Sequence, residues 1–119
     1  MSRAALWLAA AALLAVAGAP EAGARGNAEA GKVKAEKGVG GQPACATCHG
    51  PTGAKPVAPD QPILAGQYYD YLVKALSDYK SGKRANAVMK VIATPLSKQD
   101  IEDLSAWFAS QKSSLHFQR

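Results

Sequence analysis

Two cysteines and a histidine lie within five consecutive residues of this 119-residue chain, in the order Cys45, Cys48, His49. No other cysteine occurs in the sequence. In a helical turn, side chains three residues apart point to the same side, so both thiols would face the same bound group. The histidine is the next residue, so its imidazole would lie beside that group. This cluster constrains the fold more than any other feature, because the chain has to be built around whatever the three side chains hold.

Several chemistries use such a group of side chains. The form Cys-x-x-Cys-His is that of covalent haem attachment, in which two thiols add to the vinyl groups of one porphyrin edge and the histidine reaches the iron. A redox dithiol would need a βαβ setting, and no alternating strand pattern is present. A structural zinc site needs four ligands, and only His116 in the C-terminal tail could join these three. A disulfide between Cys45 and Cys48 would close a tiny loop that restrains the unfolded chain very little. The sequence therefore favours one covalently bound haem c.

The composition also suits an interior filled by a cofactor. Apolar residues make up 48% of the chain, but aromatic residues only 7%. Bulky side chains for a large core are therefore few, and small domains often depend on a metal, a disulfide or a cofactor. The length fits one domain.

The N-terminus has the pattern of a secretory signal peptide. A basic residue precedes an uncharged run over residues 4–19, which is short for a membrane span and suits an h-region. Small-residue cleavage patterns end at Ala19 and Ala24, and the second is preferred because Pro20 would directly follow the first cut. An uncleaved anchor helix is the alternative. We expect residues 1–24 to be removed, leaving a periplasmic protein without a stable membrane span.

Three helices are expected, over about residues 28–37, over about 66–80, and from Ser97 onward. Asn27 suits the N-cap of the first helix. The second shows apolar residues at steps of three and four. Ser97, with Asp100 three residues later, is a weaker version of a capping box.

The remaining segments are expected to be irregular. Four prolines in residues 50–62 argue against regular structure there. We therefore predict an all-α fold in which three main helices and ordered loops wrap a covalently bound haem. Residues 25–111 form the predicted domain, and residues 112–119 a flexible C-terminal tail.

A second protein ligand for the iron could come from the chain downstream of His49. After removal of the signal peptide, Met89 is the only methionine, and it lies in a segment, 85–95, that is expected to be a loop. A thioether is a soft ligand that favours ferrous iron. A methionine that fills a gap in the core is the ordinary alternative, and His116 is the other possible ligand. We predict His49 and Met89 as the two ligands of the iron.

These motifs resemble the class I c-type cytochromes of the small bacterial single-haem subgroup. The chain is also similar to one half of the dihaem carriers of that subgroup. The resemblance spans residues 27–110, and its motifs lie at 29–32, 45–50, 62–67, 71–74, 79–82, 86–89, 92–93, 96–97 and 100–101. Ala87 and Pro95 depart from the family pattern, and both lie close to Met89.

The resemblance implies the class I cytochrome c fold and three further features. Gly31 would cross Trp107, so that the first and last helices touch closely. The Pro62 carbonyl would accept a hydrogen bond from the ring nitrogen of His49 that does not bind iron. Met89 would match the axial methionine of the family.

With both axial positions filled, no open site remains for a substrate. The expected function is electron transport in a respiratory chain, by a carrier that is not itself an enzyme. A haem c subunit of a larger oxidoreductase is one alternative. A gas-binding haem sensor is another, and it requires that Met89 be absent from the iron or easily displaced.

Charge indicates the kind of partner. The formal net charge is +5, and residues 74–98 hold six Lys and Arg with Asp78 as the sole acid. We expect this basic stretch to steer docking onto acidic surfaces of a reductase or a terminal oxidase, with general solubility as the alternative. A nucleic-acid partner is not expected for an exported protein, and a monomer is expected, with a dimer left open. Asp100, Glu102 and Asp103 are expected to form a solvated face near a helix start.

Overall fold

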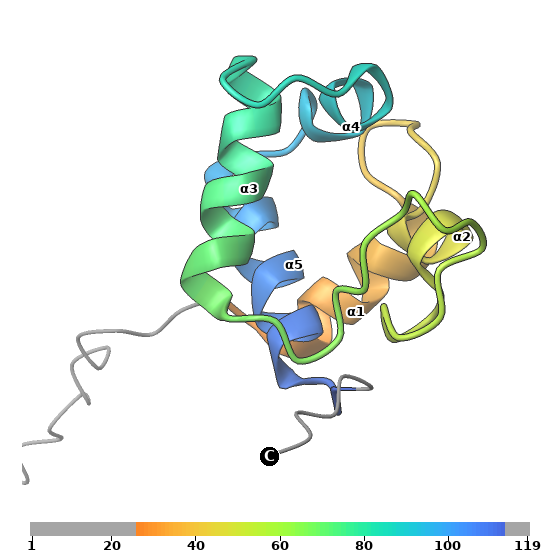
Figure 1. Cartoon of the computed structure of the whole chain (residues 1–119). Coiled ribbons are helices and arrows are strands. Elements are labelled where there is room, and N and C mark those ends of the chain that lie inside the picture. Colours follow the sequence, from red (N-terminus) through yellow and green to blue (C-terminus); the bar gives the residue numbers. More distant parts are fainter. Residues whose placement is uncertain (1–25, 114–119) are drawn as a thin grey trace, which may run out of the picture.

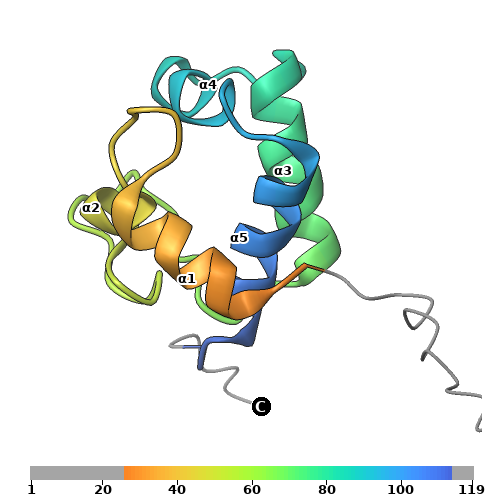
Figure 2. The same ribbon diagram turned by 180° about the vertical axis from the view of Figure 1, so that it is seen from behind.

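A computed structural model describes residues 26–113, which form five helices and contain no strand. The helices are α1 (Ala28–Lys37), α2 (Cys45–His49), α3 (Tyr69–Ser81), α4 (Ala87–Ala93) and α5 (Lys98–Ser110). They form a ring with α3 on one side, α4 at one end, and α1 and α2 opposite α3 (Figure 1). The view from behind shows the same order, with α5 beside α1 and α3 (Figure 2). The predicted all-α fold is confirmed.

The termini and their predicted roles lie outside this range. The expected signal peptide and His116 belong to residues that the structure does not describe. Within residues 26–113, no helix is long and apolar enough to cross a bilayer.

The caps of α1 and α5 are as predicted. The Asn27 side chain accepts a hydrogen bond from the Ala30 N–H at 3.0 Å. The Ser97 hydroxyl accepts from the Asp100 N–H at 3.0 Å, and the Asp100 carboxylate accepts from the Ser97 N–H at 2.8 Å. Each cap satisfies backbone donors that the first turn of a helix leaves unpaired.

The second expected helix begins later than predicted. α3 starts at Tyr69 because Gly66 has φ +73°, which a right-handed helix does not allow, and Tyr68 is extended. The prediction of helix from residue 66 was therefore wrong by three residues.

Residues 85–95 were predicted to be a loop, and this prediction was wrong because they contain α4. The Asn86 side chain accepts a hydrogen bond from the Met89 N–H at 2.9 Å and caps the helix. At the other end, the Thr94 N–H donates to the Lys90 carbonyl at 3.0 Å. Met89 therefore lies on a helix, where its side-chain direction is set by the helical turn.

α1 and α5 cross in close contact at Gly31. A Cβ atom placed on Gly31 would lie 1.9 Å from the Asp103 carbonyl oxygen and 2.9 Å from the Trp107 Cβ. Only a residue without a side chain lets the two backbones approach this closely. The crossing of Gly31 with Trp107, which the family resemblance implies, is thus present.

A buried carboxylate ties the same two helices together. Asp103 is 3% exposed and accepts hydrogen bonds from the Asn27 N–H at 2.7 Å, the Lys34 ammonium at 2.6 Å and the Gln99 amide at 2.8 Å. Burial opposes ionisation of this carboxyl, but its three donors outweigh that effect and hold the pKa of Asp103 below its ordinary value. The hydrogen bond to Asp103, reinforced by Asp100, raises the pKa of Lys34. The expected solvated acidic face is therefore wrong for Asp103.

Candidate functional site

The two cysteines share the short helix α2. Both are free and half-buried. The helix ends at Gly50, whose φ of +86° turns the chain away while its N–H donates to the Ala46 carbonyl at 3.0 Å. Burial raises the pKa of the Cys45 thiol, whereas redox dithiols carry a thiol of lowered pKa. The arrangement fits two thiols on one side of a helical turn, and the raised pKa of Cys45 does not support the redox-dithiol alternative.

His49 is the last residue of α2 and is buried, with 6% of its surface exposed. Its Nδ1 lies 2.9 Å from the Pro62 carbonyl oxygen. A carbonyl can only accept, so Nδ1 carries a proton, and in the neutral ring Nε2 is then the nitrogen with the free lone pair. This hydrogen bond fixes both the tautomer and the ring orientation in the form that a metal ligand requires.

A folded-back loop after α2 brings the acceptor to the histidine. The Val57 N–H donates to the Cys48 carbonyl at 2.9 Å, and the Leu64 N–H donates to the Gly53 carbonyl at 2.8 Å. Gly53 has φ +76°, and a Cβ atom there would lie 2.8 Å from both the Leu64 Cβ and the Phe108 Cδ1. The loop thus packs against α2 and α5, and at Gly53 the contact leaves no space for a side chain.

Met89 lies on the inward side of α4. Met89 and Ile92 are half-buried and Ala93 is fully buried, which places residues at steps of three and four on one face. Val88 and Val91 are 66% and 54% exposed on the outward face. α4 and α2 occupy different sides of the ring (Figure 1), so the thioether and the imidazole come from separate walls of the molecule.

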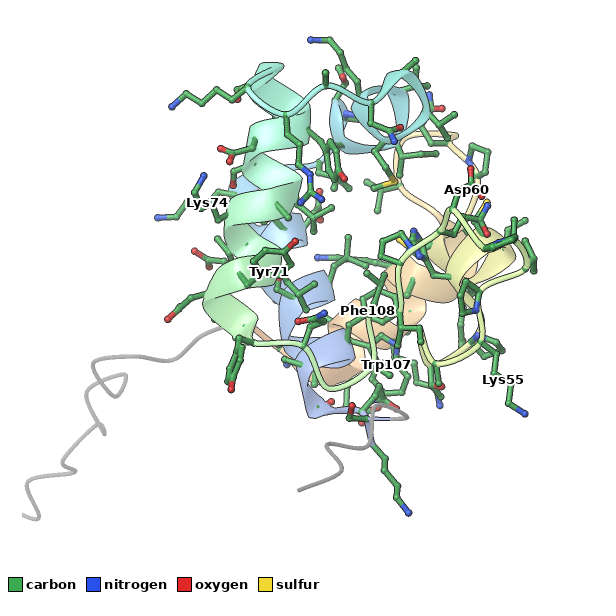
Figure 3. The ribbon with its side chains drawn as sticks, in the orientation of Figure 1. Lys55, Asp60, Tyr71, Lys74, Trp107 and Phe108 are labelled. Atoms are coloured by element: carbon green, nitrogen blue, oxygen red, sulfur yellow. The ribbon has the colours of Figure 1, made fainter. Side chains whose placement is uncertain are left out.

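The interior of the ring is lined by apolar side chains, as a bound haem would require. The buried apolar core consists of Leu72, Leu96, Ile101, Leu104 and Phe108 with three alanines, Ala35, Ala65 and Ala93. Apolar side chains that are only partly buried pack against this core, namely Val39, Cys45, Leu64, Val73, Leu76, Tyr79, Trp107 and Ala109. Figure 3 shows Phe108 on the inner side of the ring and Lys55 and Lys74 pointing outward.

The sulfur and nitrogen atoms of the proposed site also suit a haem. Two thiols, one imidazole nitrogen and one thioether are the side chains that attach and ligate a haem c iron. Apolar walls provide the surroundings in which a porphyrin is buried. The residues present therefore fit a covalently bound haem.

A zinc site finds no support in the part of the chain that the structure describes. There, no group of three or more His, Cys, Asp and Glu side chains is arranged to hold a metal ion. Reasoning from the sequence included Asn86 only as part of a family motif and missed its role as the cap of the helix that carries Met89. The available signal was an Asn before a short apolar run, since Asn is a preferred N-cap.

The sequence of this chain matches a known protein family and several of its members. The family model described as cytochrome c matches residues 28–112. Cytochrome c4 of Pseudomonas aeruginosa is 46% identical over 92 residues, which cover 77% of this chain and 42% of the relative. The chain thus spans less than half the length of this curated relative.

Solved structures agree with the sequence comparison. The structure of cytochrome c4 from Acidithiobacillus ferrooxidans superposes with a TM-score of 0.65 and 35% identity, over 70% of this chain and 49% of that one. The structure of thiosulfate dehydrogenase from Marichromatium purpuratum gives a TM-score of 0.67 and 34% identity, over 83% of this chain and 22% of that one. The helical ring is therefore shared with larger redox proteins.

Proposed function

Because this chain belongs to the cytochrome c family, we propose that it carries single electrons on one haem c ligated by His49 and Met89. The family binds haem c covalently, and Cys45, Cys48 and His49 match its attachment motif. One observation carries the proposal. His49 is buried beside the two thiols, and the Pro62 carbonyl holds its Nδ1 at 2.9 Å.

Each residue of the proposed site has a defined task. Haem c supplies a reversible ferric–ferrous couple when bound. Cys45 and Cys48 anchor it covalently and prevent its loss. His49 donates its Nε2 lone pair, and the hydrogen bond to Pro62 makes the imidazole a stronger donor. Met89 supplies a thioether, which stabilises the ferrous state and raises the reduction potential. With His49 and Met89 as its two protein ligands, the iron would exchange electrons and would leave no position for a substrate.

The ligand assignment is tested by replacing Met89 with a residue of similar size that lacks sulfur. We expect Met89→Leu to abolish the weak far-red absorption band of the ferric holoprotein and to lower its reduction potential. Ile92→Leu is the matched control, because it lies on the same inward side of α4, and it should change neither. A far-red band that persists in Met89→Leu would refute methionine ligation.

One further measurement on the same protein distinguishes an electron carrier from a gas-binding sensor. Carbon monoxide should bind slowly or not at all to the ferrous wild-type protein, because Met89 as the second ligand would hold the position that the gas needs. Rapid binding by the untreated protein would favour a sensor.

A haem subunit of a larger oxidoreductase is the second candidate function. The likeness to the thiosulfate dehydrogenase structure supports it, since 83% of this chain superposes on 22% of that protein. Purification from the native cells followed by size-exclusion chromatography distinguishes the two. A carrier elutes at the mass of the chain plus one haem, whereas a subunit elutes with a larger partner.

We place the protein in the periplasm, as a carrier between redox proteins. The secretory pattern of residues 1–24 supports this location. Mass spectrometry of the protein from its native cells should find a chain that begins at Arg25 and carries one haem. A mature chain that retains residues 1–24 would contradict export with cleavage.

A further inference from the structure

The connection between α4 and α5 is short and is bonded closely to the end of α4. Four residues, 94–97, join the two helices. The Thr94 hydroxyl donates to the Lys90 carbonyl at 2.6 Å, and the Leu96 N–H donates to the Ala93 carbonyl at 3.1 Å. These hydrogen bonds continue the backbone of α4 into the connection as a tight turn. A displacement of the connection would therefore displace the whole helix.

The core and the loop before α2 hold this connection from two directions. The Leu96 side chain is 2% exposed and belongs to the apolar core. Gly40 lies against the other side, because a Cβ atom on Gly40 would be 2.6 Å from the Pro95 Cβ. The ring of Pro95 also fixes the φ angle at this position. The connection is therefore restricted both by burial and by its own backbone.

Lys80 holds the connection from a third direction, that of α3. It lies in the last turn of α3, and this end of α3 is next to α4 (Figure 1). The Lys80 ammonium donates a hydrogen bond to the Leu96 carbonyl, which is 16 residues further along the chain. A hydrogen bond with an ionised donor is stronger than one between neutral groups. Lys80 thus links α3 directly to the backbone that follows α4.

A groove between α3 and α5 accommodates the stem of this lysine. Its volume is about 560 Å³, and Val73 and Ser77 of α3 and Ile101 and Glu102 of α5 contribute to its lining. Lys80 lines the same groove, so its aliphatic stem lies between the helices while its charged end reaches the backbone. Because Lys80 remains partly exposed, its replacement changes this contact without opening the core.

We propose that Lys80 is a positioning residue for Met89, and that its hydrogen bond to Leu96 helps to keep the thioether of Met89 on the haem iron. The inference rests on the proposed ligation of the iron by Met89. A thioether is neutral, so no net charge draws it to the metal, and its binding depends on how firmly the protein presents it. A contact that restricts the end of α4 favours ligation, because less freedom is lost when the thioether binds.

Competition by imidazole measures how readily Met89 leaves the iron of the ferric holoprotein. Imidazole is itself a ligand for haem iron, and it can bind only where Met89 has left, so its apparent affinity reports the hold on Met89. The variant is Lys80→Leu, which keeps an apolar side chain in the groove and has no donor. Lys80→Arg keeps a charged donor and is the rescue variant. Lys83→Leu is the matched control, since Lys83 is exposed in the segment after α3 and its loss changes the net charge equally.

We expect Lys80→Leu to bind imidazole about fivefold more tightly than wild type, because it loses one hydrogen bond from a charged donor. Lys80→Arg and Lys83→Leu should bind imidazole with wild-type affinity. In a denaturant titration, Lys80→Leu should lose the far-red band of the ferric protein before it loses helical circular dichroism. Equal imidazole affinities of Lys80→Leu and Lys83→Leu would overturn the proposal. A loss of overall stability at unchanged imidazole affinity would overturn it as well, because the contact would then be structural alone.

The proposed ligation and the role of Lys80 fail in different ways. A ferric wild-type protein without the far-red band would refute ligation by Met89 itself. A wild-type protein that has the band, together with a Lys80→Leu variant of wild-type imidazole affinity, would refute only the role of Lys80.

Discussion

The contact between His49 and Pro62 is made to a backbone carbonyl, so no side-chain substitution deletes it directly. What proline contributes is a restricted backbone, which keeps that carbonyl in place and limits the unfolded chain. The identity of residue 62 should therefore affect both the stability of the loop and the electronic state of the imidazole.

We expect Pro62→Ala to lower the free energy of unfolding by about 0.4–1 kcal/mol and to shift the reduction potential. Pro59→Ala, at an exposed site in the same loop, should lower stability by a similar amount and leave the potential unchanged. Denaturant titration and redox titration of both variants provide the comparison. Identical potentials would mean that the proline does not position the carbonyl.

The Asp103 carboxylate makes stability depend on acid. Because its pKa is held below the ordinary value, the folded state gains stability above the unfolded pKa of about 4 and loses it as the pH falls through the folded pKa. We expect Asp103→Asn to cost about 1–3 kcal/mol at pH 7 and to flatten the decline in stability below pH 4.

Denaturant unfolding between pH 7 and pH 3 measures this dependence. Asp60→Asn is the control, since Asp60 is exposed in the loop between α2 and α3, and its acid dependence should follow wild type. A wild-type decline in Asp103→Asn would assign the acid sensitivity to other groups.

At the scale of elements, the residue at the crossing point determines how closely helices α1 and α5 approach each other. Gly31 makes this crossing possible, because an added Cβ would overlap the backbone of α5. The crossing also brings Lys34 within reach of Asp103. A small change at one residue of α1 therefore acts on a whole helix pair.

We expect Gly31→Ala to lower the free energy of unfolding by about 2–3 kcal/mol, because α1 has to move away from α5. Gly41→Ala is an informative contrast. No atom lies within 4 Å of a Cβ at Gly41, but its φ is +76°, so only backbone strain of about 1–2 kcal/mol applies. Thermal unfolding of both holoproteins checks the order, and a larger loss in Gly41→Ala would contradict the close crossing.

At the scale of the whole molecule, the buried apolar core within residues 26–113 is small. Three of its eight members are alanines, and small domains with thin cores depend on other sources of stability. The covalently bound haem provides the missing buried surface.

A chain that cannot attach haem should therefore lose its ordered fold. We expect Cys45→Ala with Cys48→Ala to show much reduced helical circular dichroism and no cooperative thermal transition. The wild-type holoprotein, produced with the maturation machinery, is the reference. Cooperative unfolding of the haem-free variant at the wild-type temperature would show that side chains alone are sufficient.

Most of the architecture could be predicted because its signals are local. The caps at Asn27 and Ser97 act within three residues of their positions, and apolar residues at steps of three and four mark one face of α3 and α5. α4 was missed because its seven residues are apolar on nearly every side, so no periodicity distinguishes an inner face. Only the cap residue before it carried a usable signal.

The sequence by itself determined the attachment group, since Cys45, Cys48 and His49 are covalent neighbours whose spacing needs no tertiary contact. It also predicted the three longer helices, apart from the start of α3. Only the tertiary structure decided that the thioether of Met89 belongs to an inward helix face and that Asp103 is buried. It also provided the contact between Asn27 and Asp103, and it gave a distance to the contact between the Pro62 carbonyl and His49 that the family resemblance implies. These features join residues as much as 76 positions apart, and their geometry exists only when the loops close and the helices pack.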